Sequence, residues 1–172
     1  MELTLRTISR RTKWGILLLG FIMSFSMGLL FWGHIPYNIN LIDWLIVIIV
    51  ACAVVTIVHE GLHGLFFKIF GGDVKFGVAK SSLGPTPYAT SLTYLPRFHF
   101  QLVGLAPQLL TIACLIGLLT SPPPMVAVGL IIVAAGNLGG GCFDLYTAKW
   151  LNRFPREYKV LDIKDGVKVV AS

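Results

Sequence analysis

Long apolar runs separated by short polar connections dominate the chain. Four runs are each long enough to cross a hydrocarbon layer about 30 Å thick as a helix. They predict membrane-spanning helices over residues 14–33, 41–70, 99–120 and 125–147. The connections between them contain Pro, Gly, Asn or Ser, which are typical of helix ends and turns. This pattern predicts an α-helical integral membrane protein with four transmembrane helices.

The connection between the second and third runs, residues 73–97, has a different pattern. Apolar residues alternate with polar or small ones in Val74–Lys80 and more weakly in Tyr88–Tyr94, with Gly84-Pro85-Thr86-Pro87 between them. Alternation around turn residues predicts a small β-hairpin or sheet, with an irregular loop as the alternative. A similar pattern around Asp165-Gly166 predicts a small hairpin in a short cytoplasmic tail, residues 148–172.

Composition agrees with the membrane interpretation. Hydrophobic residues make up 55% of the 172 residues and charged residues 13%, whereas soluble domains carry about 25% charged residues. We therefore expect one membrane domain over residues 1–172, with the lipid bilayer as a partner. The net charge of +6 does not lie on an amphipathic or aromatic-interleaved surface, so nucleic acid is not expected as a partner.

The cationic residues predict the orientation of the spans. Four of them fall in the first thirteen residues, and others lie in the central connection and the tail. The connections over residues 34–40 and 121–124 have none. Because Lys and Arg are enriched in cytoplasmic connections, we expect a multi-pass plasma-membrane protein with both termini and the central connection in the cytoplasm.

The second run contains the motif His59-Glu60-Gly61-Leu62-His63. Two histidines four residues apart lie on one face of a helix, so both can bind one Zn²⁺ at about 2.0–2.1 Å. Glu60 then lies beside the open position of the metal, where it can take a proton from bound water. An acid in the middle of a span costs at least about 2.5–3.5 kcal/mol, which favours a functional role for Glu60.

A catalytic zinc site usually has a third protein ligand, and Asp144 is the best candidate. Glu60 and Asp144 are the carboxylates that fall inside the predicted spans away from their starts. The second and fourth runs cross the membrane in the same direction, so Asp144 reaches a depth similar to that of the histidines. The glycines at 136 and 139–141 would allow two helices to approach closely. A helix-packing patch with an interfacial aspartate is the alternative.

Two further polar residues are candidates for substrate contacts. Asn137 lies two helical turns before Asp144 on the same face. It can bond a substrate carbonyl or an oxyanion, or it can form an interhelical hydrogen bond. His99 is expected close in depth to the metal, but an interfacial role is favoured for it over a contact with substrate or metal.

The motif within a span, the β-prone connection and the later Asn137 and Asp144 resemble those of membrane-embedded zinc metalloproteases of the site-2-protease type. In size and four-span layout the chain is more similar to the small bacterial zincin peptidases, since Leu145 stands where site-2 proteases typically have glycine. The resemblance implies zinc ligation by His59, His63 and Asp144, with Glu60 as catalytic base.

The function we expect is therefore a membrane-embedded zinc metalloprotease. It would hydrolyse a peptide bond of a membrane-associated protein or peptide near the cytoplasmic face, and the edge of the central hairpin would bind the substrate as an added strand. The alternatives are a non-catalytic, zinc-holding membrane chaperone or pseudo-protease, and a zinc hydrolase of a non-peptide bond. An intact Glu60 disfavours the first alternative. The substrate and the oligomeric state are not predicted.

Overall fold

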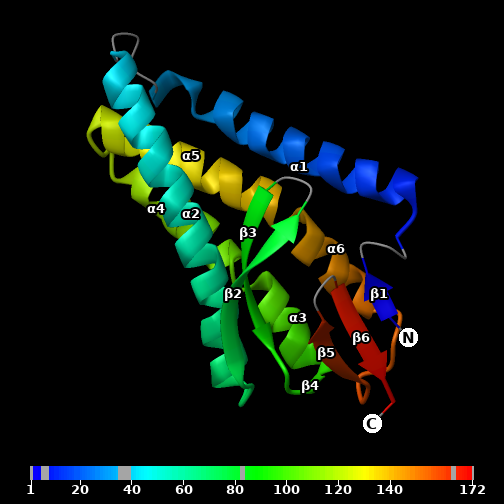
Figure 1. The fold of residues 1–172 in the computed structure, drawn as a ribbon. Helices are drawn as coiled ribbons and strands as arrows, with labels where there is room; N and C mark the ends of the chain where they lie inside the picture. Colours follow the sequence, from blue (N-terminus) through cyan, green and yellow to red (C-terminus); the bar gives the residue numbers. More distant parts are fainter. Residues whose placement is uncertain (1, 5–7, 35–39, 82–83, 164–165, 172) are drawn as a thin grey trace. The chain divides into compact units, whose positions relative to one another are not determined.

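The computed structural model describes residues 2–4, 8–34, 40–81, 84–163 and 166–171 (Figure 1). Its helices and strands are β1 (Glu2–Thr4), α1 (Arg10–Leu30), η1 (Trp32–His34), α2 (Leu41–Ile69), β2 (Val74–Ser81), β3 (Gly84–Ser91), β4 (Leu95–Pro96), α3 (Arg97–Leu105), α4 (Gln108–Leu119), α5 (Pro124–Gly140), α6 (Cys142–Leu151), β5 (Lys159–Ile163) and β6 (Gly166–Val170). The chain forms two compact units. One comprises Met1–Ile16, Glu60–Pro107 and Phe143–Ser172, and the other Leu17–His59 and Gln108–Cys142.

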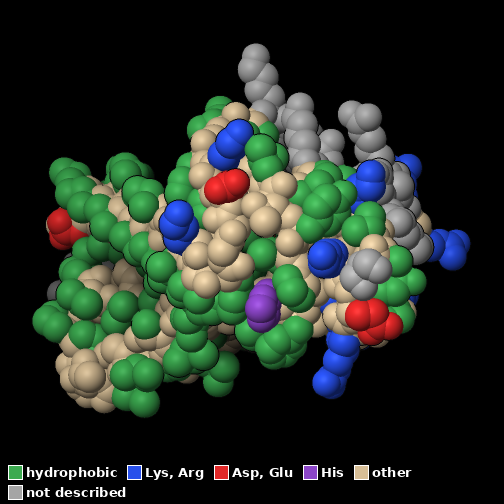
Figure 2. Space-filling view, turned by 90° about the horizontal axis from the view of Figure 1, so that it is seen from below, with side chains coloured by type: hydrophobic (Ala, Val, Ile, Leu, Met, Phe, Trp, Pro, Cys, Tyr) green, Lys and Arg blue, Asp and Glu red, His purple; other side chains and the backbone are tan. Residues whose placement is uncertain are grey.

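Within the described residues, three helical stretches are long and apolar enough to cross a membrane: Arg10–Leu30, Leu41–Ile69 and Arg97–Leu119. A fourth follows if α5 and α6, which are bent by 41° at their junction, form one broken span. These helices expose large hydrophobic side chains, among them Leu30, Leu41 and Leu119, and Figure 2 shows many hydrophobic side chains on one face of the molecule. Apolar surface of this extent indicates contact with a membrane rather than with water.

Helix packing builds the unit formed by Leu17–His59 and Gln108–Cys142. Its main core includes Met27, Ala51, Cys114, Val133 and Ala134. The backbones of α1 and α5 approach so closely that a Cβ at Gly20 would lie 2.8 Å from the carbonyl oxygen of Gly139. The hydroxyl of Ser24 donates to the carbonyl of Ala135 at 2.8 Å.

The other unit contains a four-stranded antiparallel sheet in the order β1-β6-β5-β4 and a separate hairpin, β2–β3. The sheet side of its core is formed by Leu95, Val160, Val167 and Val169, which are at most 4% exposed. Further residues of this core come from the end of α2, from α3 and from α6: Phe67, Phe100, Val103, Trp150 and Leu151. Three separate parts of the sequence therefore meet in one small sheet.

The structure confirms several predicted elements. Helix α2 covers Leu41–Ile69, close to the predicted 41–70, and the chain turns at Gly71 and Gly72. The N–H of Gly71 donates to the carbonyl of Lys68, the N–H of Gly72 donates to that of Phe67, and Gly71 has a φ of 78°. This is the glycine-dependent helix end known as the Schellman motif. The central hairpin is present as β2–β3, but Gly84-Pro85-Thr86-Pro87, expected between its strands, lies in β3 itself. The third run divides at Pro107 into α3 and α4.

Other predictions need correction. Helix α1 begins at Arg10, four residues before the predicted start, because polar residues can continue a helix beyond its apolar run. The fourth run is not one regular helix. It bends at Gly141, and α6 extends to Leu151. The tail is not merely a short appendage, since β5 and β6 pair with β4 and β1. Residues 35–39 of the first predicted turn, and Lys164 and Asp165 of the tail turn, lie outside the described residues.

Candidate metal centre

Helix α2 carries both histidines of the motif. The helix runs without a break from Leu41 to Ile69, so the side chains of His59 and His63 lie one turn apart on the same face. This arrangement follows from the local helix alone. It confirms the expected helical spacing of the motif and leaves the orientation of each ring to be set by other contacts.

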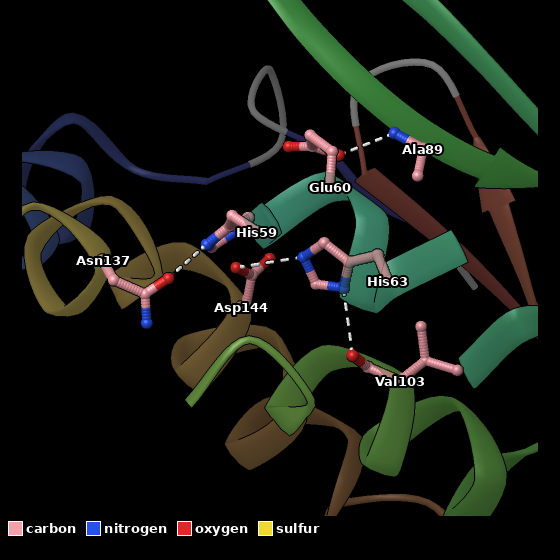
Figure 3. A network of polar contacts seen from close by, with 7 residues as sticks. All are labelled: His59, Glu60, His63, Ala89, Val103, Asn137 and Asp144. Carbon is pink, nitrogen blue, oxygen red and sulfur yellow. Dashed lines mark hydrogen bonds and ion pairs between the residues drawn. The ribbon is translucent and has the colours of Figure 1, made fainter. Parts of the chain in front are cut away.

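A backbone carbonyl orients the ring of His63. The Nδ1 atom of His63 lies 3.0 Å from the carbonyl oxygen of Val103 in α3. Because a carbonyl oxygen can only accept, Nδ1 carries a hydrogen, and in the neutral ring Nε2 is then the nitrogen with the lone pair. That Nε2 lies 3.5 Å from Oδ2 of Asp144 (Figure 3). The ring therefore turns a nitrogen that can bind a metal toward a carboxylate oxygen.

An asparagine orients the ring of His59 in the same way. The Nδ1 atom of His59 lies 2.9 Å from Oδ1 of Asn137 (Figure 3). The Nδ2 atom of Asn137 donates to the hydroxyl of Thr111 at 2.8 Å, and the Oδ1 atom is the end of the amide that faces His59. An amide oxygen can only accept, so Nδ1 of His59 also carries the hydrogen. Each imidazole thus makes the outward hydrogen bond that zinc-binding histidines almost always make.

The break between α5 and α6 places Asp144 at a helix beginning. Asp144 lies in the first turn of α6, where the helix dipole favours a carboxylate. Its backbone packs near Gly104 of α3. The side chain of Gln101 in α3 donates to the carbonyl of Ala148 in α6 at 2.7 Å. Helix α3 thus contacts both His63, through Val103, and the helix that carries Asp144.

These three side chains fit a zinc ion. One ligand atom each of His59, His63 and Asp144 lies within 4.8 Å of the others. Two ligands of a tetrahedral zinc are separated by about 3.3 Å when each bond is about 2.0–2.1 Å long. The 3.5 Å between His63 and Asp144 is close to that value. Two imidazoles and a carboxylate match the ligand set of many catalytic zinc sites, which keep a fourth position open.

Glu60 stands apart from this ligand set. Its Oε2 atom accepts a hydrogen bond of 2.6 Å from the backbone N–H of Ala89 in β3 (Figure 3). The contact was not foreseen from the sequence, because a backbone donor leaves no mark in the residue pattern. It gives the carboxylate a fixed direction beside the central hairpin.

The remaining candidates take other positions. Both ends of the Asn137 amide are engaged, one by His59 and one by Thr111. The ring of His99 stacks on that of Phe70 at 4.4 Å and is not part of the group of possible ligands found among the described residues. The glycines of the fourth run pack against two different helices. Gly139 packs on α1, whereas Gly136 lies near Val55 of α2 and Gly141 lies near His59 of α2.

Two residues near the site were missed by sequence reasoning. The buried side-chain nitrogen of Gln108 has no hydrogen-bond partner among the described residues and lies near Gly141. Asp162 of β5 is the second. Its burial raises the pKa of the carboxyl from 3.8 to about 7, and Glu60 and Asp144 add to this, while the Thr90 hydroxyl and His63 oppose it. Asp162 could have been noticed, because it follows Val160 by two residues on a predicted strand.

Comparison with known proteins gives one match. Residues 52–159 match the model of the family described as "Putative zincin peptidase". No match was found among curated proteins or among solved structures. The matched segment includes the His59–His63 motif, Asn137 and Asp144. Since it covers more than half of the sequence, the chain belongs to this zincin peptidase family.

Proposed function

We propose that the chain is a membrane-embedded zinc metalloprotease that hydrolyses a peptide bond of a membrane-associated protein or peptide. The observation that carries this proposal is the orientation of the two imidazoles. Their Nδ1 atoms are engaged by Asn137 and Val103, which leaves both Nε2 atoms to share one ion with Asp144. Glu60 is bonded to Ala89 instead, as expected for a base that acts beside the metal.

Each residue has a distinct role in this proposal. His59, His63 and Asp144 hold the zinc, which supplies Lewis-acid activation of water and of the substrate carbonyl. Glu60 takes the proton from the attacking water on its carboxylate and delivers it to the amine nitrogen of the departing half of the peptide. Val103 and Asn137 keep the imidazoles in the tautomer that binds a metal.

The proposal includes a topology. Four spans, with α5 and α6 as one broken span, would place both termini and the β2–β3 hairpin in the cytoplasm of a plasma-membrane protein. The supporting facts are the apolar helices and the cations in the N-terminal segment, central connection and tail. The motif lies in the second half of α2, the half nearer the hairpin, so cleavage would occur near the cytoplasmic face.

Strand β3 is the proposed docking edge for an extended substrate. Ala89 donates its N–H to Glu60, so this N–H lies on the edge of β3 that faces away from β2. Pro85 and Pro87 occupy the same edge by alternation, and proline has no N–H to donate. Because the N–H of Ala89 is already bonded to Glu60, a substrate strand would find mainly carbonyl acceptors on this edge before Ala89. This scarcity of donors disfavours docking along the whole strand.

Reconstitution into liposomes with membrane-anchored peptides tests this function. The purified protein is expected to contain one zinc per chain and to cleave the anchored peptides, with mass spectrometry locating the cleaved bond. Removal of zinc by a chelator should abolish cleavage, and added Zn²⁺ should restore it. Zinc-loaded protein that cleaves none of a broad set of anchored peptides would contradict the proposed protease activity and favour a zinc-holding role.

A further inference from the structure

Strand β5 carries a carboxyl group on the core side of its sheet. Asp162 lies two residues after Val160, which is 0% exposed, so the two side chains lie on the same face of the strand. Its partner across the sheet is Val167, and Val160 is paired with Val169. Val167 and Val169 are 4% and 1% exposed. An aspartate thus occupies a position whose neighbours on that face are buried valines.

Such a position is unfavourable for a carboxyl group unless a hydrogen bond compensates for the lost water. Asp162 has this bond with the hydroxyl of Thr90 in β3. Strands β3 and β5 belong to different sheets but contact one another. The Asp162–Thr90 hydrogen bond therefore joins the C-terminal hairpin β5–β6 to the central hairpin β2–β3.

Thr90 directly follows Ala89, whose N–H donates to Glu60 at 2.6 Å. Ala89 is 9% exposed, and Ser91 on the other side of Thr90 is 0% exposed. The three residues from Ala89 to Ser91 are also held at their C-terminal end, because Ser91 packs against Gly72 in the turn after α2. Consecutive Cα atoms are only about 3.8 Å apart, so a bond that holds the Thr90 side chain also limits the movement of the Ala89 N–H.

We propose that Asp162 is a positioning residue for Glu60, acting through the Thr90 hydroxyl and the Ala89 N–H. The C-terminal hairpin then sets the direction of the base, although it does not touch the reacting atoms. This inference rests on the proposed role of Glu60 in proteolysis. Asp162 lies beyond the matched residues 52–159, so this role does not follow from membership of the family.

Paired substitutions separate positioning from simple structural support. Thr90→Val and Asp162→Leu remove the donor and the acceptor of the bond. Thr90→Ser and Asp162→Asn keep a hydroxyl and an acceptor oxygen at the same positions, and they serve as matched controls. The double variant Thr90→Val/Asp162→Leu completes a mutant cycle. Zinc content and thermal unfolding of the full-length protein are measured for every variant.

The first measurement needs no substrate. Hydrogen exchange of the Ala89 amide is expected to accelerate about tenfold in Thr90→Val and in Asp162→Leu, since each loss frees the segment that holds this N–H. The Ser and Asn controls should exchange like the wild type. Ala89 exchange that is unchanged in both disruptive variants would overturn the proposal, whether or not the protein proves to be a protease. If one disruptive variant fails to fold, the other decides the result.

The second measurement is hydrolysis of a membrane-anchored fluorogenic peptide. We expect kcat to fall about tenfold or more in either disruptive variant, with KM and zinc content close to wild type, because only the efficiency of the base is reduced. The kcat of the double variant should be no lower than that of the single variants, since both substitutions remove the same bond. Additive losses, or losses that follow zinc content, would contradict a positioning role.

Discussion

The Oδ1 atom of Asn137 accepts a hydrogen bond from Nδ1 of His59 at 2.9 Å. The sequence suggested two roles for this asparagine: a partner for the substrate or oxyanion, or an interhelical hydrogen bond. In the structure its amide joins α5 to α2 through His59 and to α4 through Thr111. Asn137 is completely buried, which suits a residue that orients a metal ligand.

Loss of this bond should weaken zinc binding. We expect Asn137→Ala to lower zinc affinity by about 10–100-fold, the usual effect of removing the hydrogen-bond partner of a metal-binding histidine. Asn137→Asp keeps an acceptor oxygen and is the matched control. The measurement is a competitive titration with a zinc chelator. Equal affinities of Asn137→Ala and the wild type would contradict this role of Asn137.

Substitution of Asp144, the proposed third ligand, should reduce the metal content more severely. Asp144→Ala is expected to purify with little or no zinc, because two histidines alone leave the site one protein ligand short. Asp43 is a suitable control, since it lies in the first turn of α2 and is bonded to Asn40 rather than to the site. Asp43→Ala should keep one zinc per chain. Full zinc occupancy in Asp144→Ala, measured by elemental analysis, would remove Asp144 from the ligand set.

The contact between α1 and α5 predicts opposite outcomes for two glycines of one helix. A Cβ at Gly20 would meet the carbonyl oxygen of Gly139 at 2.8 Å, whereas a Cβ at Gly28 would meet nothing within 4 Å. Gly20→Ala should therefore destabilise the protein by about 1–3 kcal/mol through overpacking. Gly28→Ala should be neutral or stabilising by up to about 1 kcal/mol, because alanine favours the helix. Thermal unfolding in detergent compares the two variants.

Asp162 predicts how the stability of the zinc-free protein depends on pH. Burial raises the pKa of its carboxyl from 3.8 to about 7 in the folded protein. Between these values the folded state keeps a proton that the unfolded state has released. The contribution of this group to stability is therefore fully present below pH 3.8 and is lost as the pH rises towards 7. The free energy of unfolding, measured by chemical denaturation from pH 4 to 8, should therefore decline less with rising pH in Asp162→Asn than in the wild type. An identical pH profile in the variant would contradict the raised pKa.

Local patterns were sufficient for much of the fold. The apolar run of α2, its glycine end and the alternation in β2 determine those elements through neighbouring residues, and the spacing of His59 and His63 follows from the helix. The four-stranded sheet was not predicted, because β1 and β4 have only three and two residues. Their pairing depends on contacts between distant parts of the chain.

The same limit applies to the site. Asp144 could be chosen as a candidate ligand because of its expected membrane depth and because few carboxylates lie inside the predicted spans. The bend at Gly141 was not predicted, since a glycine-rich helix can either pack closely or break. The contacts that orient the site use backbone groups of Val103 and Ala89. Every residue has these groups, so their use cannot be read from side-chain patterns. Asp162 did leave a signal, a carboxylate at a core-facing strand position.

In the proposed mechanism Glu60 acts as a base beside zinc held by His59, His63 and Asp144. The most direct test is Glu60→Gln, with zinc content and peptide hydrolysis measured on the same liposome preparation. We expect one zinc per chain and a loss of hydrolysis of about 100-fold or more, because the amide cannot accept the proton. Hydrolysis at the wild-type rate by zinc-loaded Glu60→Gln would contradict the proposed role of Glu60 as the base.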